Sequence, residues 1–218
     1  MSKEKTFIPA LRFNWLTGIF DPLLKYTMPE KRFKSALIDQ AKISPSHSVL
    51  DFGCGSLTLT LLAKQKQPQA AFTGVDVDEK ILTIARKKLG PSNSAIRIDK
   101  YDGLVLPYND SSFDRVITSL VFHHLTTEQK ESSLKEIKRI LKPGGELHIA
   151  DWGKPSNFLM RFAFYSVQLL DGFKTTRDNV KGLLPEFIRK AGFKEVSLHS
   201  RFNTIYGTLQ LYKTKKTD

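Results

Sequence analysis

The sequence has little of what secreted or membrane-spanning proteins need. A single cysteine among 218 residues excludes a disulfide within the chain, so a reducing compartment is expected. No apolar run approaches the roughly 20 residues that cross a bilayer. The N-terminus, residues 1–5, lacks the long apolar core of a signal peptide. Together these absences predict a cytoplasmic protein, and the length predicts one domain with a substantial core.

Acidic residues are few relative to basic ones. The chain has 22 aspartates and glutamates against 34 lysines and arginines, which gives a formal net charge of +12. A positive surface attracts nucleic acid, an anionic membrane or an anionic substrate. The charges are dispersed along the chain, however, and a solvated surface with excess lysine explains them equally well. Charge alone therefore selects no partner.

Two nucleotide-binding motifs are also missing, although a glycine turn is present. Gly53-Cys54-Gly55 follows a short apolar run and predicts a ligand-binding turn between a strand and a helix. The dinucleotide fingerprint needs Gly or Ala where the chain has Thr58, and no Gly-Lys-Ser/Thr follows to form a P-loop. Asp76 ends the next apolar run about 20 residues later, the separation expected for a carboxylate that binds ribose hydroxyls. The ligand expected here is therefore of the adenosine type.

Apolar strands and amphipathic helices alternate along most of the chain. Strands are predicted at residues 49–52, 71–75, 95–98, 113–119 and 146–150, and helices at 57–67, 79–89, 127–141 and 177–191. We expect Asp78 and Thr127 to cap the second and third of these helices. The alternation predicts a parallel sheet with helices on both faces. The last two strands, 196–200 and 204–213, have a connection short enough, residues 201–203, for an antiparallel hairpin.

Two segments are more apolar than a single helix face requires. Residues 1–43 precede the first core strand and predict a helical cap that packs on the sheet and covers the cofactor and substrate. Residues 155–173 predict a buried helix, the wall of an apolar substrate pocket or a surface that leans on a membrane. Phe20 and Tyr165, one from each segment, are candidate substrate contacts. Residues 44–218 would form the rest of the same domain.

Four motifs resemble, in order and spacing, those of class I S-adenosylmethionine-dependent methyltransferases. They are Asp51-x-Gly53-x-Gly55 with Gly74-x-Asp76, Asp102-Gly103 with residues 112–117, residues 119–125, and residues 141–145. They cover roughly residues 45–152, and four ordered motifs are far more specific than one glycine turn. Within the family the chain resembles the methyltransferase type 11 branch, which includes ubiquinone and menaquinone biosynthesis methyltransferases and some phospholipid N-methyltransferases.

The resemblance implies a fold, a cofactor and the residues that bind it. The fold would be α/β, a Rossmann-like, mostly parallel seven-stranded sheet with the last strand antiparallel, and the cofactor S-adenosylmethionine, converted to S-adenosylhomocysteine. The residues implied are Asp51, Gly53, Cys54 and Gly55 around the methionine part, Asp76 at the ribose, Val77, Asp102 and Gly103 at the adenine, and Ser119 at the methyl-transfer position. Structural explanations stand beside these roles, because Asp51 could cap a helix and Asp102-Gly103 is a common turn pair.

Candidate residues for the acceptor side follow the fourth and fifth strands. His123 and His124 are of a type that titrates near neutrality and suits a base that accepts a proton from the acceptor. Packing or hydrogen bonding within the loop explains them equally well. Asp151 and Trp152 are candidates for orienting the substrate or packing on its rings. No metal ligand is predicted.

The favoured function is transfer of a methyl group to a small apolar or lipid-like acceptor, such as a quinol or a phospholipid amine. An RNA methyltransferase is the first alternative because of the positive charge, but the sequence has no appended RNA-binding motif and no Asn-Pro-Pro-Tyr signature. A non-catalytic cofactor-binding module is the second. Besides the small-molecule acceptor, an anionic membrane is expected as a peripheral partner. The methylated atom and the oligomeric state stay open.

Overall fold

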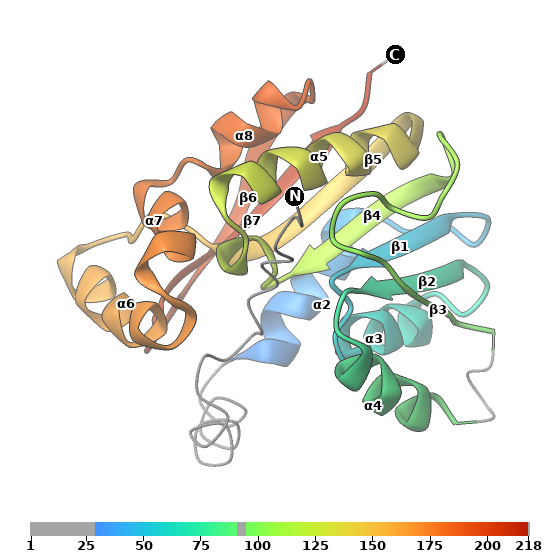
Figure 1. The fold of residues 1–218 in the computed structure, drawn as a ribbon, viewed down its shortest axis with the longest axis horizontal. Helices are drawn as coiled ribbons and strands as arrows, with labels where there is room; N and C mark the ends of the chain where they lie inside the picture. The colour runs from blue at the N-terminus through green and yellow to red at the C-terminus, as the bar shows by residue number, and fades with distance from the viewer. Residues whose placement is uncertain (1–28, 91–94, 218) are drawn as a thin grey trace, which may run out of the picture.

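Within residues 29–90 and 95–217, which the computed structural model describes, seven strands form one sheet in the order β3-β2-β1-β4-β5-β7-β6 (Figure 1). The strands are β1 Ser48–Phe52, β2 Ala71–Asp76, β3 Arg97–Lys100, β4 Phe113–Ser119, β5 Leu141–Trp152, β6 Lys194–Thr204 and β7 Gly207–Lys215. The first five are parallel, whereas β7 runs antiparallel to both β5 and β6. The predicted fold class is confirmed.

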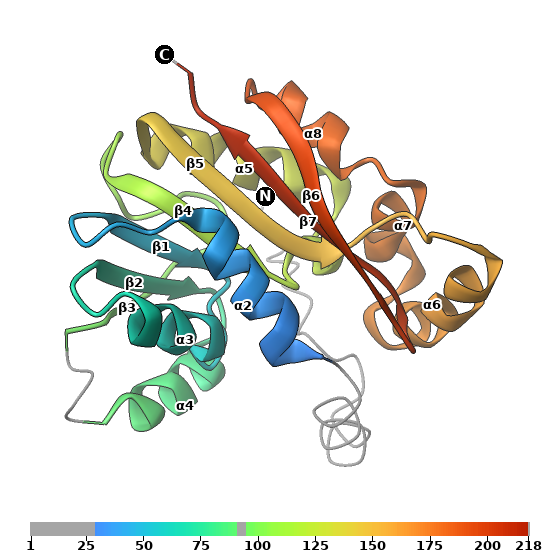
Figure 2. The same cartoon turned by 180° about the vertical axis from the view of Figure 1, so that it is seen from behind.

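Helices cover both faces of this sheet. They are α2 Glu30–Ala41, α3 Thr58–Lys66, α4 Glu79–Leu89, α5 Thr127–Ile140, α6 Phe158–Asp171, α7 Phe173–Lys181 and α8 Leu184–Lys190, with a 3₁₀ turn, η2, at Phe122–His124. Helices α5 and α8 lie over the face seen in Figure 1, and α2 and α3 over the face seen in Figure 2. Successive strand residues therefore enter different cores: Val49 packs with the α2 and α3 side, and Leu50 with the α5 and α8 side.

The N-terminal cap is described only from Pro29 onward. Helix α2 crosses the sheet, with Phe33 and Leu37 fully buried, and the Gln40 side chain donates to the backbone carbonyl of Tyr212 on β7 at 2.9 Å. This helix is therefore part of the main core. Phe20 and the rest of residues 1–28 lie outside the described residues, so the lid over the site stays a prediction.

Helix caps agree with the sequence at one position and differ at another. Asp78 caps α4 as predicted, because its Oδ1 accepts the N–H of Lys80 at 2.8 Å. Helix α5 is capped by Thr126 and not by Thr127, through a capping box with Gln129. Thr126 has an extended backbone that points its hydroxyl at the first turn, whereas the Thr127 hydroxyl donates to Asp178 at 2.7 Å. The predicted cap was therefore wrong by one residue.

Two predicted connections were also wrong. The single helix over 177–191 is in fact α7 and α8, because Gly182 has a φ of +74°, a left-handed angle that ends α7. The final hairpin turns at residues 205–206, and residues 201–203 continue β6. Thr204 stabilises that turn, since its hydroxyl oxygen accepts the Tyr206 N–H at 3.1 Å and donates to the Gly207 carbonyl at 3.0 Å.

Helix α6 has an exposed apolar face, which overturns the prediction of a buried helix for residues 155–173. Phe164 is buried, but the exposed fraction of the residue is 84% for Phe158, 71% for Phe162 and 66% for Leu169. The helix lies beyond the carboxyl end of β5 and covers the sheet with only one side (Figure 1). Among the described helices, none combines the length and apolarity needed to cross a bilayer.

Candidate active site

The candidate site lies along one edge of the sheet. The parallel strands β1 to β5 all end there, and their register pairs Phe52 with Val75, Asp76 with Lys100 and Ser119 with Ala150. Residues that directly follow these strands are therefore neighbours even where they are far apart in sequence. Open α/β sheets bind their ligands at such an edge.

The two glycines of the turn after β1 are needed for different reasons. Gly53 has a φ of +70°, and a Cβ added there would lie 2.4 Å from Cγ2 of Val121 in the loop after β4. Gly55 has a φ of +51°, but an added Cβ would meet no atom within 4 Å. Gly53 is thus required for packing between two strand ends, whereas Gly55 borders open space that a ligand can occupy.

Asp76 joins the turn after β1 to the end of β2. Its Oδ2 accepts the N–H of Gly55 at 2.9 Å, and its Oδ1 accepts the N–H groups of Val77 at 2.7 Å and Asp78 at 3.1 Å. Burial raises the pKa of the Asp76 carboxyl, although these three N–H groups oppose the shift. Gly55, Asp76 and Val77, predicted from separate motifs, are therefore brought together.

Asp51 and Cys54 face the interior. The Asp51 side chain accepts the hydroxyl of Thr60 on α3 at 2.6 Å, and burial raises the pKa of this carboxyl to about 6. Asp51 thus holds the first turn of α3 beneath the glycine turn. Burial also raises the pKa of the Cys54 thiol far above its ordinary range, so this residue is a packed side chain without nucleophilic character.

The loop after β3 adds exposed apolar side chains to this edge of the sheet. Oδ1 of Asp102 accepts the N–H groups of Leu104 at 2.8 Å and Val105 at 3.0 Å. Gly103, between Asp102 and Leu104, has a φ of +83°. The side chains of Leu104 and Val105 are largely exposed. A planar ring bound beside this loop could contact both the Asp102 carboxylate and apolar side chains.

Ser119 ends β4 with an unpaired polar atom. Its Oγ is buried and has no hydrogen-bond partner among the described residues. The next residue, Leu120, has a φ of +59°, which is unusual for a residue with a side chain, and its N–H donates to the Ala150 carbonyl at 2.8 Å. A buried hydroxyl without a partner costs free energy unless a ligand supplies one. Ser119 is therefore a candidate ligand contact.

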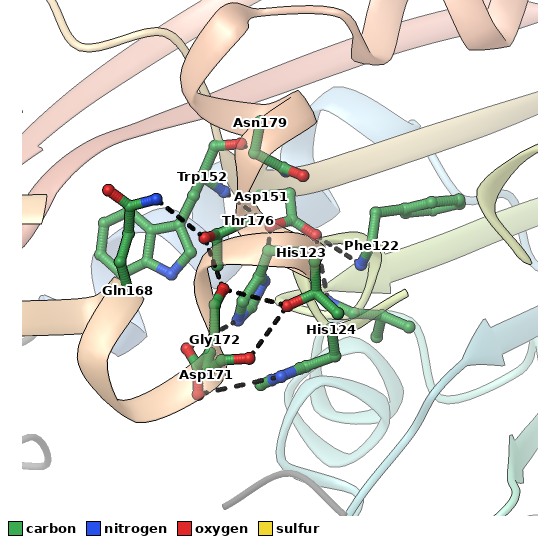
Figure 3. Close-up of polar contacts among 12 residues, drawn as sticks. Phe122, His123, His124, Asp151, Trp152, Gln168, Asp171, Gly172, Thr176 and Asn179 are labelled. Carbon is green, nitrogen blue, oxygen red and sulfur yellow. Dashed lines mark hydrogen bonds and ion pairs between the residues drawn. The ribbon is translucent and has the colours of Figure 1, made fainter. Parts of the chain in front are cut away.

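Asp151 is the centre of the acceptor side. Its Oδ2 accepts the N–H groups of Val121 at 3.1 Å and Phe122 at 2.7 Å, and its Oδ1 accepts that of Trp152 at 2.7 Å. Oδ1 is also 2.7 Å from Nδ1 of His123 (Figure 3). Asp151 is fully buried, so it positions the loop and the imidazole.

His123 lies between two carboxylates. Its Nε2 is 3.4 Å from Oδ2 of Asp171, the last residue of α6 (Figure 3). Burial alone would lower the pKa of His123, but the carboxylates of Asp151 and Asp171 raise it to about 9. Burial and the adjacent His123 lower the pKa of His124 to about 4. The two rings lie 3.9 Å apart between centroids, and the His124 side chain is 25% exposed.

Trp152 and Tyr165 take different positions from those expected of substrate contacts. Trp152 is buried, packs at 5.5 Å on the ring of Phe164, and its carbonyl accepts the side-chain amide of Asn179 at 2.8 Å. Tyr165 is exposed on α6, with the Arg161 guanidinium 4.1 Å from its ring centroid. Trp152 therefore fixes α6 and α7 to β5, and Tyr165 belongs to the outer surface.

The sequence alone did not reveal Asp171. It is the one acidic residue between positions 155 and 173, and that isolation in an apolar segment is the signal that could have singled it out. The residue reaches His123 and His124 because the α6–α7 corner at Gly172 folds onto η2 (Figure 3). Such an approach depends on tertiary packing and leaves no spacing pattern.

The residues at the edge fit S-adenosylmethionine. Open space beside Gly55, the carboxylate of Asp76 and the unpaired hydroxyl of Ser119 offer room, a partner for ribose hydroxyls and a polar contact in one row. A seven-stranded sheet with this order and this row of residues defines a class I methyltransferase-like protein.

Comparisons with known proteins agree with this class. Residues 49–145 match the family described as "Methyltransferase domain". A demethylmenaquinone methyltransferase of Lactobacillus johnsonii is 29% identical over 204 residues, 84% of this chain and 82% of that protein. An uncharacterized methyltransferase of Synechocystis sp. is 30% identical over 191 residues, 87% of each chain. A solved S-adenosylmethionine-dependent methyltransferase from Methanosarcina mazei has a TM-score of 0.66 at 18% identity, covering 83% of this chain and 97% of that one. The chain therefore belongs to the S-adenosylmethionine-dependent methyltransferases.

Proposed function

We propose that this methyltransferase acts on a small apolar acceptor that carries an aromatic hydroxyl, of the quinol class. The observation that carries the proposal is the buried His123–Asp151 pair beneath the partly exposed His124, at the end of β4. A cluster of this kind can polarise a hydroxyl group, and the exposed apolar surface of α6 begins beside it. The similarity to a demethylmenaquinone methyltransferase supports the same class of acceptor.

The cofactor half of the site would consist of the ends of β1, β2 and β3. Asp76 would accept the ribose hydroxyls, and Val77, Asp102 and Gly103 would hold the adenine. The backbone of Gly53, Cys54 and Gly55 would surround the methionine part, with Asp51 supporting the turn from below. S-adenosylmethionine brings an activated methyl group, so the protein mainly aligns the acceptor and excludes water.

The acceptor half would consist of the ends of β4 and β5 with the α6–α7 corner. His124 would accept a hydrogen bond from the acceptor hydroxyl, which increases electron density on the oxygen and on the ring carbon beside it. His123 would keep His124 and Asp171 in place through its fixed bond to Asp151. Ser119 would contact the reacting groups where the two halves meet.

Calorimetry with S-adenosylmethionine tests the cofactor half. We expect Asp76→Ala to weaken binding by about 100-fold, because the substitution removes a partly buried carboxylate that would accept hydrogen bonds from two ribose hydroxyls. Asp78→Asn is the matched control, since it removes a charge two residues away but retains a side chain that caps α4. Equal affinity of the wild type and Asp76→Ala would contradict the assignment.

Transfer of a labelled methyl group tests the acceptor. Purified protein should label a demethylated quinol and not RNA. Labelling of RNA, together with salt-sensitive RNA binding, would favour the alternative of a nucleic-acid methyltransferase. Cofactor binding without turnover of any acceptor would favour a binding module.

We also infer peripheral contact of α6 with an anionic membrane, from which an apolar acceptor could be drawn. Phe158 and Phe162 are exposed on this helix, and the exposed Lys154 and Lys174 flank it. Sedimentation with phosphatidylserine vesicles should show binding that falls with added salt and with the double variant Phe158→Ser/Phe162→Ser. Ile84→Ser, which alters an exposed residue of α4, is the control. Equal sedimentation with neutral vesicles at high salt would contradict the inference.

A further inference from the structure

The geometry points to a site for one divalent transition-metal ion, best suited to Zn²⁺, formed by His123, His124 and Asp171. One ligand atom from each residue can be chosen so that all three lie within 4.8 Å of one another. Two imidazoles and a carboxylate are ligands that zinc commonly takes in proteins. No metal ligand was predicted from the sequence, because the carboxylate comes from a distant helix.

The distances are close to those that a metal ion requires. Nε2 of His123 is 3.4 Å from Oδ2 of Asp171, and Nδ1 of His124 is 3.8 Å from Oδ1 of the same carboxylate. Ligand atoms around a tetrahedral zinc are about 3.3 Å apart, given bonds of about 2.0 to 2.1 Å. Asp171 is the last residue of α6, and the three ligand atoms, which lie within 4.8 Å of one another, would move closer together on binding an ion.

Asp151 supplies the outer partner that metal-binding histidines usually have. It lies 2.7 Å from Nδ1 of His123 and is itself held by three backbone N–H groups. When Nδ1–H donates to Asp151, the lone pair of Nε2 points at the Asp171 carboxylate. Two electron-rich groups at this separation repel each other unless a cation lies between them. In the metal-free protein that cation is a proton, and the approach of His124 supplies a third ligand for a metal ion that replaces the proton.

The charge of the three-residue cluster and its exposure to solvent also suit a divalent ion. Asp151 and Asp171 together carry two negative charges, so a divalent ion that displaces the proton of His123 makes the cluster neutral. The His124 side chain is 25% exposed and that of Asp171 is 12% exposed, which leaves a path for the ion. Three protein ligands with further positions open to solvent or substrate are typical of catalytic zinc sites and not of structural ones.

The role of the ion in catalysis rests on the proposed function, whereas its binding does not. A hydroxyl group of the acceptor that ligated the ion would release its proton to water more easily, and the oxygen would become more electron-rich. In that role the ion would replace a histidine as the group that polarises the acceptor. The site would also help to select acceptors with a hydroxyl at the required position.

The test is metal binding by the full chain after removal of metals with a chelator. Calorimetry with ZnCl₂ should show one equivalent bound, and Co²⁺ should give the strong visible absorption of a tetrahedral site. Asp171→Asn and His124→Asn should each weaken Zn²⁺ binding at least tenfold. Both residues are partly exposed, so these variants are expected to fold. His199→Asn, on the exposed surface of β6, should bind as the wild type does.

Thermal unfolding gives an independent readout. Zn²⁺ should raise the melting temperature of the wild type and of His199→Asn but not that of Asp171→Asn. Absence of binding to the wild type, or binding that Asp171→Asn leaves unchanged, would overturn the metal site and leave a proton as the cation. S-adenosylmethionine affinity, measured on the same samples, should be equal in all variants. Failure of the metal site is therefore distinguishable from failure of the methyltransferase assignment.

Discussion

Two carboxylates at the same edge of the sheet are held in the same way but have different uses. Asp76 accepts N–H groups from Gly55, Val77 and Asp78, and Asp151 accepts them from Val121, Phe122 and Trp152. Each one thus joins a strand end to the loop that follows the neighbouring strand. Asp76 is only partly buried, so a ligand can reach it, whereas Asp151 is fully buried and is bonded to His123.

Because of this difference, one carboxylate is free to bind a ligand and the other supports neighbouring protein groups. On the cofactor side the carboxylate itself would meet the ligand. On the acceptor side it holds a histidine, and the groups that reach solvent are His124 and Asp171. The cofactor side would therefore be formed by residues close to the ends of β1, β2 and β3, whereas the acceptor side would need the α6–α7 corner as well.

The largest expected effect comes from removing each carboxylate in turn. Asp151→Ala leaves three backbone N–H groups without a partner and removes one of the two carboxylates beside the buried His123, so we expect a loss of about 3 to 5 kcal/mol in the free energy of unfolding. Asp76→Ala should cost only about 1 kcal/mol, because water can replace a partly exposed carboxylate. Urea denaturation measures both. Equal losses would show that the two sites do not differ in the way described.

The glycines of the turn allow a second comparison. Gly53→Ala places a methyl group against Val121 at a left-handed backbone angle, so we expect it to lower stability by about 2 to 4 kcal/mol. Gly55→Ala should cost about 1 kcal/mol, from the backbone angle alone, yet weaken S-adenosylmethionine binding at least tenfold, because the methyl group enters the ligand's space. Denaturation and calorimetry on both variants test this. Normal cofactor affinity of Gly55→Ala would place the ligand elsewhere.

A third comparison concerns pH and Asp51. Burial raises the pKa of this carboxyl from 3.8 to about 6, so the folded state binds one more proton than the unfolded state between those values. Stability should therefore fall as pH rises through this window, by about 3 kcal/mol from this group, and stay lower above it. Asp51→Asn should remove that fall and be more stable than the wild type at pH 7. Asp39→Asn, an exposed carboxylate on α2, is the control and should keep the slope.

Local sequence was a good guide where neighbouring residues decide the structure. The predicted strands at 49–52 and 113–119 formed, and Asp78 capped the helix that follows it. Local sequence was a poor guide where contacts with distant residues determine the structure. The apolar composition of residues 155–173 left a buried helix, a pocket wall and a membrane-facing surface open, and the exposed side chains of α6 exclude the first of these. Gly182 was read as part of a helix interior although its backbone angle ends α7.

The same distinction between local and distant contacts applies to the candidate site. Asp51, Gly53, Gly55 and Asp76 could be recognised because a strand, a turn and the next strand fix their spacing. The role of Asp151 could not be, because it depends on three N–H groups and an imidazole that are close only in the folded chain.

A crystal structure with S-adenosylhomocysteine bound would test the central claim most directly. We predict that the ribose hydroxyls lie within hydrogen-bonding distance of the Asp76 carboxylate, that the adenine lies beside Asp102, and that the sulfur atom points toward Ser119. A ligand bound at another edge of the sheet, or one whose ribose has no contact with Asp76, would contradict the account.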